Sequence, residues 1–150
     1  MIGYNDNPDA TRATIDVDGW LHTGDLGTMD AQGFIRVTGR VKDMIIRGGE
    51  NLFPAEIEAV LVEHSQIAQV CIIGLPDEKW GETIKALVVL ADGESVNERD
   101  LIDHCRDQIA HFKCPTSVEF RDELASTATG KLQKFKLRSP YWEGMDRQVN

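Results

Sequence analysis

The sequence lacks the features that mark disulfide-rich, metal-binding and membrane-spanning proteins. It has three cysteines, an odd number, and no two of them show the C-x-x-C spacing of a zinc or redox site. No apolar run approaches the roughly 20 residues that span a bilayer, and the first residues have neither the charge nor the apolar core of a signal peptide. We therefore expect buried or incidental thiols, no bound metal or prosthetic group, no transmembrane segment and a cytoplasmic location.

Positive charge is also scarce. Sixteen Lys and Arg residues stand against 25 Asp and Glu residues, which leaves a net charge of −9. A chain with this balance does not attract nucleic acid or an anionic membrane through its overall field. Any anionic ligand must therefore be bound by a local group of basic or hydrogen-bonding residues.

The first part of the chain predicts a β-hairpin after a polar, turn-rich start. Strands are expected at 26–29 and 34–38, with a Gly-containing turn between them, because Gly tolerates positive φ. Gly39-Arg40 lies between this hairpin and a new run of structure. We therefore predict a domain boundary there, with domains at 1–39 and 40–150.

The second part predicts an α+β fold, in which a small β-sheet is covered by helices. Its apolar residues alternate in some segments and recur at helical spacing in others. In chain order we expect a β-rich run at 41–47, a helix beginning at Pro54, strands at 69–75 and 83–90, a helix with a Ser95–Glu98 capping box, a strand at 117–120 and a short basic helix ending near Arg138.

A loop of small, hydroxyl-bearing and basic residues from Ser126 to Lys131 could bind an anion. A Gly frees the backbone, hydroxyls bind oxyanions, and Lys131 supplies a compact positive charge, which suits phosphate or carboxylate. The loop is not a Walker A motif, because Leu132 stands where Ser or Thr must hold magnesium. Taken alone, the same pattern fits an ordinary exposed surface loop better.

Three charged residues near the predicted boundary are further candidates. Asp25, after a Thr-Gly turn, could accept two hydrogen bonds from a ribose diol, or could merely shape its own turn. Arg40 could clamp a phosphate or a ribose oxygen. Lys42 could be a hinge residue that absorbs a backbone rotation, although, taken alone, the segment fits an exposed Lys–Asp turn better.

Two aromatic residues lie next to lysines in connecting segments. Trp80 lies in the loop between two predicted strands, and Phe112 follows a predicted helix. Exposed aromatic rings beside Lys can stack on an adenine base. Packing at the edge of the core is the alternative for both rings.

Three motifs, taken together and in this order, resemble the adenylate-forming enzymes. They are GWLHTGD at 19–25, GRVKDMIIRGGENLFPAEIE at 39–58 and TATGKLQK at 127–134. This family includes acyl- and aryl-CoA synthetases, firefly luciferase and the adenylation domains of peptide synthetases. The resemblance extends over essentially the whole chain but only over the last third of a family member.

The resemblance implies an activity and a missing partner domain. Members of the family make an acyl adenylate from ATP and a carboxylic acid, and after rotation of the smaller C-terminal domain a thiol attacks that adenylate. It implies that ATP with Mg²⁺, CoA and a small carboxylic acid are substrates of the whole enzyme. It also implies that residues 1–39 are a hairpin remnant of a large N-terminal nucleotide-binding domain, and that residues 40–150 are the mobile catalytic-lysine domain.

The resemblance also assigns roles to individual residues by matching positions. By this match, Asp25 and Arg40 are the nucleotide-binding pair, and Lys42 is the hinge. The residues close to CoA and pantetheine are Gly48, Gly49, Trp80 and Phe112. Lys131 is the catalytic lysine. Two departures from the family pattern are Leu124-Ala125, where many members read Leu-Pro, and Cys114, where some CoA ligases have Arg.

We interpret the chain as a fragment of an acyl-CoA synthetase that acts on fatty acids, and we expect the fragment alone to be inactive. One alternative is a non-enzymatic docking or weak CoA- or nucleotide-binding module. Another is an adenylation domain that loads a carrier protein. If the large domain is missing, the hairpin should be mobile or should pair with another copy through its exposed edges.

Overall fold

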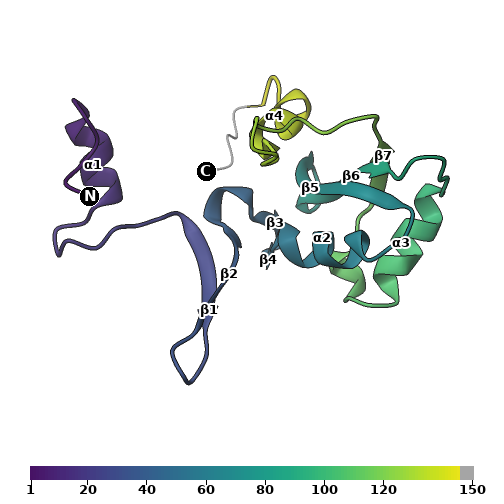
Figure 1. Cartoon of the computed structure of the whole chain (residues 1–150), viewed down its shortest axis with the longest axis horizontal. Coiled ribbons are helices and arrows are strands. Elements are labelled where there is room, and N and C mark those ends of the chain that lie inside the picture. The colour runs from purple at the N-terminus through teal and green to yellow at the C-terminus, as the bar shows by residue number, and fades with distance from the viewer. Residues whose placement is uncertain (146–150) are drawn as a thin grey trace. The chain divides into compact units, whose positions relative to one another are not determined.

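The computed structural model describes residues 1–145. The chain divides into two compact units, which meet between Val41 and Lys42. This division lies two residues beyond the boundary expected after Gly39. Figure 1 shows the elements of each unit.

The first unit contains a helix, α1 (Pro8–Thr14), and a hairpin of two antiparallel strands, β1 (Asp25–Met29) and β2 (Ile35–Arg40). The hairpin was predicted and α1 was not. The α1 helix begins after Asn7, whose side-chain oxygen accepts a hydrogen bond from the Ala10 amide at 3.0 Å, as an N-cap residue does.

No residue of the first unit is buried. Large apolar side chains of the hairpin are exposed, including Phe34 at 75% and Ile35 at 73%. A two-stranded hairpin is at best marginally stable in water unless a further surface covers its apolar residues. Pairing of its edges with another copy stays a prediction.

The second unit is an α+β domain, as predicted. It contains a five-stranded sheet in which β6 (Gly81–Leu90) is central. The neighbour β5 (Ile67–Asp77) pairs with β6 antiparallel along its length. β6 also pairs at Gly81 with β3 (Ile45–Arg47), which is followed by β4 (Glu50–Leu52), and it pairs in parallel with β7 (Ser117–Phe120).

Both faces of this sheet are covered, which explains the apolar composition of β5 and β6. On one face, α2 (Pro54–Val62) and α3 (Glu98–Arg106) contribute Ile57, Leu61, Leu101 and Cys105 to the larger core cluster. On the other face, Leu124 and α4 (Lys134–Arg138) join Cys71, Ile73 and Leu87 in a smaller cluster. In Figure 1, α4 lies across the sheet from α2 and α3. Three short 3-10 turns complete the fold: η1 (Val41–Asp43), η2 (His111–Lys113) and η3 (Ser139–Tyr141).

Two local predictions were wrong. Residues 41–43 form the η1 turn, so the β-structure expected from 41 begins only at Ile45. The Ser95–Glu98 capping box is absent, because Asn97 caps α3 by accepting a hydrogen bond from the Asp100 amide at 2.9 Å. The Glu98 carboxylate instead accepts a hydrogen bond from the Val118 amide on β7 at 2.7 Å, and a tertiary contact of this kind cannot be read from local spacing.

Candidate active site

The Ser126–Lys131 loop is held in shape by its own hydrogen bonds. The Thr127 amide donates to the Lys131 carbonyl at 2.8 Å, and the Thr127 hydroxyl accepts from the Lys131 amide at 3.1 Å. Gly130 adopts a φ of +81°, which favours glycine. Ser126 and Leu132 close the base of the loop with an antiparallel bridge. The loop therefore presents Lys131 from a fixed backbone.

The Lys131 side chain is exposed, and within residues 1–145 its ammonium forms no ion pair or hydrogen bond. Lys134, three residues further on, is bound instead. Its ammonium donates to the Glu58 carboxylate at 2.7 Å, and the same oxygen accepts from the Ile72 amide at 2.8 Å. These bonds tie α4 to α2 and β5, so the loop stands on a rigid base while Lys131 remains available to a ligand.

A groove of about 480 Å³ runs beside this loop within the second unit. Its walls come from α2, from the start of β5 and from the loop itself. The residues that line it are Ala55, Glu58, Ala59, Val62, Gln69, Val70, Ser126, Gly130 and Leu132.

The structure brings together the four residues assigned to CoA. Gly48 and Gly49 form a turn between β3 and β4, with φ of +60° and +87°. The Gly48 amide donates to the Trp80 carbonyl at 2.8 Å, and a Cβ at Gly48 would lie 2.9 Å from the Trp80 ring. Phe112 joins the group through its carbonyl, which accepts a hydrogen bond from Arg47 Nη1 at 2.8 Å.

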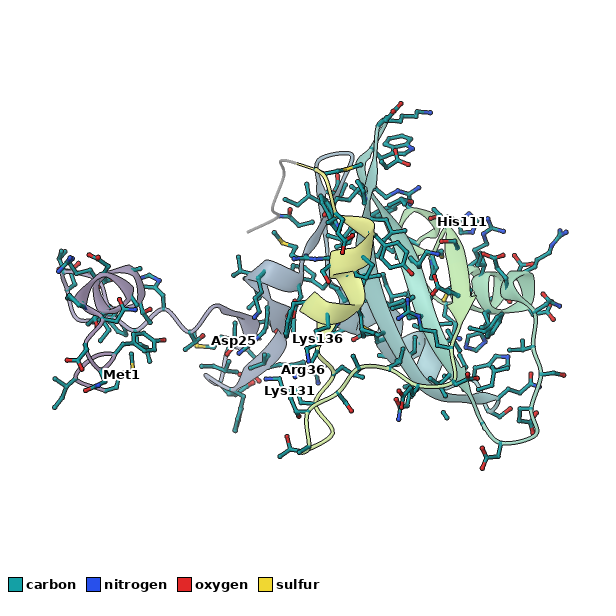
Figure 2. All side chains as sticks on the ribbon, turned by 90° about the horizontal axis from the view of Figure 1, so that it is seen from above. Met1, Asp25, Arg36, His111, Lys131 and Lys136 are labelled. Carbon is teal, nitrogen blue, oxygen red and sulfur yellow. The ribbon has the colours of Figure 1, made fainter. Side chains whose placement is uncertain are left out.

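This group lies away from the lysine loop. Phe112 belongs to η2, which begins at His111, and Figure 2 shows His111 and Lys131 well apart on the second unit. One small domain therefore carries two separate sets of candidate residues.

Asp25 and Arg40 face each other across the open end of the hairpin. Arg40 Nε donates to Asp25 Oδ1 at 3.0 Å, and the Asp25 amide donates to the Thr23 hydroxyl at 3.1 Å. Both side chains are about two-fifths exposed, so the pair contributes little to stability. Asp25 Oδ2 has no protein partner among the described residues and remains open to a hydroxyl donor.

Lys42 begins the second unit, within η1. Its backbone carbonyl accepts a hydrogen bond from Arg138 Nη1 of α4 at 3.2 Å. The backbone at Lys42 is therefore attached to α4, the helix that follows the lysine loop. Sequence reasoning had not identified Arg138 or Glu58 as supports.

The three cysteines are free and buried. Burial raises the pKa of the Cys71 thiol to about 12, and it does the same for Cys105. Within the described part of the chain, no group of three or more His, Cys, Asp and Glu residues is arranged to hold a metal ion, and no helix there is long and apolar enough to cross a membrane.

Known proteins match this chain in both sequence and fold. The long-chain-fatty-acid–CoA ligase FadD13 of Mycobacterium tuberculosis (strain CDC 1551 / Oshkosh) is 44% identical over 138 residues, which are 92% of this chain and 27% of that protein. The fatty acid–[acyl-carrier-protein] ligase ScoC of Streptomyces coeruleorubidus is 43% identical over 150 residues, which are 100% of this chain and 29% of that protein.

Among solved structures, ATP-bound MatB from Rhodopseudomonas palustris superimposes with a TM-score of 0.88 at 35% identity. The match covers 94% of this chain and 28% of that one. The chain thus spans about a quarter of the length of the curated relatives it matches. The family model described as the AMP-binding enzyme C-terminal domain matches residues 56–131 of the 150. On these similarities, the chain belongs to the adenylate-forming enzymes and contains their C-terminal domain.

Proposed function

We propose that this chain is the C-terminal part of an ATP-dependent acid–CoA ligase. The whole enzyme activates a carboxylic acid as its acyl adenylate and then transfers the acyl group to CoA. ATP with Mg²⁺, CoA and the acid are its substrates. One observation carries the proposal: Lys131 is an exposed cation without a carboxylate partner among residues 1–145, on a loop fixed by its own hydrogen bonds, in a chain of net charge −9.

The first half-reaction needs such a cation. A carboxylate oxygen attacks the α-phosphorus of ATP, a new P–O bond forms, and the bond to pyrophosphate breaks. Attack brings two anions together, so an ammonium group between them offsets their repulsion and stabilises charge in the transition state. The rigid loop holds Lys131 in place before the reaction, which lowers the cost of orienting it.

The remaining residues fit the nucleotide and the second half-reaction. Asp25 binds the ribose hydroxyls through its open oxygen, and Arg40 orients that carboxylate and contacts the nucleotide. Lys42 is the hinge about which the second unit turns. Rotation withdraws Lys131 and brings Gly48 and Gly49 to the pantetheine arm, so one cleft serves two reactions in turn.

Two variants of the full-length enzyme test the role of Lys131. Lys131→Ala should slow pyrophosphate release from ATP and acid by at least about a hundredfold, while CoA attack on a supplied acyl adenylate continues. Lys136→Ala is the matched control. Lys136 is an exposed lysine on α4 whose ammonium lies 6.0 Å from the centroid of the Phe135 ring and forms no ion pair among residues 1–145, and its loss should leave both steps near the wild-type rate. If Lys131→Ala slowed adenylate formation and CoA attack by the same factor, the assignment of Lys131 to the first half-reaction would be contradicted.

We propose fatty acids as the acid class, since FadD13 and ScoC carry that substrate in their names. Comparing kcat/KM of the full-length enzyme for fatty acids of several lengths and for an aromatic acid tests this. An aromatic acid used better than every fatty acid would overturn it.

A carrier protein is the second candidate acceptor, because the match to ScoC covers all 150 residues of this chain and ScoC is named as an acyl-carrier-protein ligase. Incubation of the full-length enzyme with acid, ATP and either free CoA or a carrier protein distinguishes the two acceptors. The isolated 150-residue chain should not turn over ATP, and measurable pyrophosphate release by it would contradict the fragment interpretation.

A further inference from the structure

The lysine loop is a small closed hairpin held together by bonds within residues 125–133. Thr127 and Lys131 are joined by two hydrogen bonds near its tip. At its base, the Gln133 amide donates to the Ala125 carbonyl at 2.8 Å. Because both partners of each bond belong to the loop, these bonds fix the shape of the loop but not its direction relative to the sheet.

Two anchors connect this hairpin to the rest of the domain. Leu124 precedes it and is 5% exposed in the smaller core cluster. Lys134 follows it, and its ammonium donates to Glu58 Oε1 at 2.7 Å. The groove of about 480 Å³ opens between α2 and the loop, so packing does not immobilise this side of the loop. Apolar contacts are non-directional, whereas a charge-assisted hydrogen bond has a preferred geometry. The direction of the hairpin therefore depends on the ion pair.

Glu58 is suited to this role because it is fixed independently of the loop. It lies on α2, and its Oε1 also accepts from the amide of Ile72, a buried residue of β5, at 2.8 Å. The side chains of Glu58 and Lys134 are only 21% and 22% exposed, so water screens this pair less than it screens a surface pair. A carboxylate attached to both helix and sheet thus holds the chain three residues after Lys131.

We propose that Glu58 and Lys134 are positioning residues that hold Lys131 in the orientation required for the first half-reaction. This inference rests on the proposed function, because it takes Lys131 to be the cation of that reaction. Loss of the ion pair leaves the hairpin intact but lets it tilt, and a misplacement of about 1 Å can slow a reaction by about a hundredfold. The effect is confined to the step that uses Lys131.

The test measures both half-reactions of the full-length enzyme. Glu58→Gln should lower kcat for pyrophosphate release by about tenfold or more, with KM for ATP and for the acid within about threefold of wild type. CoA attack on a supplied acyl adenylate should stay near the wild-type rate. In a Lys131→Ala background, Glu58→Gln should cause less than about a twofold further loss, because positioning has no effect once the ammonium is absent.

Two variants at Lys134 separate the lost anchor from an unpaired charge. Lys134→Arg keeps a cation and should keep most of the rate of pyrophosphate release. Glu58→Gln combined with Lys134→Gln removes both charges, so it leaves no partly buried ion without its partner, and it should be as slow as Glu58→Gln alone. Urea unfolding shows whether each variant is folded. A double variant that regained the wild-type rate would overturn the inference.

Glu56→Gln is the matched control. It removes a lysine–carboxylate pair of the same kind from the same helix, but the partner is Lys113 of η2 and not a residue next to the lysine loop. Pyrophosphate release should stay near the wild-type rate.

Three results for Glu58→Gln would overturn the inference while leaving the ligase proposal standing. They are a wild-type rate of pyrophosphate release, equal slowing of the two half-reactions, and the same loss with and without Lys131. If Lys131→Ala itself formed the adenylate at the wild-type rate, the role proposed for Lys131 would fail instead.

Discussion

The Glu119 carboxylate should make the stability of the second unit depend on pH. Glu119 lies on β7 and receives three hydrogen bonds: from the Tyr141 hydroxyl at 2.5 Å, from Arg121 at 2.9 Å and from Lys85 at 3.2 Å. The Tyr141 bond is the largest cause of a lowered pKa, which falls from 4.5 to about 2. Because Tyr141 belongs to η3, this carboxylate attaches the segment after the lysine loop to the sheet.

The size of the effect follows from the shift in pKa. A fall of this size corresponds to at most about 3 kcal/mol. The Glu119 side chain is 34% exposed, so solvent screening reduces this contribution to about 1–2 kcal/mol. Since the pKa is lower in the folded state than in the unfolded state, the stabilisation is fully present above about pH 4.5 and is lost as the pH falls towards 2.

Urea unfolding of the chain, followed by tryptophan fluorescence, measures this. Trp142 is a suitable reporter because its indole N–H donates to the Gly74 carbonyl at 3.0 Å. The free energy of unfolding of Glu119→Gln should be lower than that of wild type by about 1–2 kcal/mol near pH 7, and the difference should shrink as the pH falls towards about 2. Glu123→Gln, which removes an exposed carboxylate without a protein partner among the described residues, should behave like wild type. A gap between Glu119→Gln and wild type that stays constant with pH would refute the reasoning.

Three further outcomes are expected. Gly48→Ala should destabilise the chain by about 1–2 kcal/mol in urea unfolding, because φ is +60° and the new Cβ meets the Trp80 ring; a neutral effect would show that the turn rearranges freely. Asn97→Ala should lower the unfolding free energy by about 1 kcal/mol and Ser95→Ala by almost nothing, whereas the reverse order would restore the capping box predicted from sequence. Cys71, whose pKa burial raises to about 12, should resist a thiol-reactive disulfide at about pH 8 until urea unfolds the chain, and rapid labelling of the native chain would contradict its burial.

Much of the fold could be predicted because its signals are local. Pro54 stands at the first turn of α2, where its missing N–H costs nothing. The buried residues of β6 alternate over its first half and then become continuous, as expected of a strand covered on both faces. The α1 helix was missed because it is short, polar and has no buried face.

The support of the candidate site could not be predicted, because it depends on contacts between distant segments. Lys131 was found from its loop, but the Lys134–Glu58 ion pair joins residues 76 positions apart. The buried carboxylate of Glu82 accepts from the Ile46 amide on β3, and its spacing in β6 gives no sign of this. Sequence patterns show which residues face inwards, whereas the polar partners of those residues depend on how the elements pack.

The order in which the sheet is covered has a consequence during synthesis. Leu124, Leu137 and Tyr141 close the face that holds Cys71, Ile73 and Leu87. Until residues 124–141 have left the ribosome, that face is bare and prone to aggregation and proteolysis. Lys131 is encoded within the same stretch, so a nascent chain released before the lysine is added also lacks the segment that completes the core.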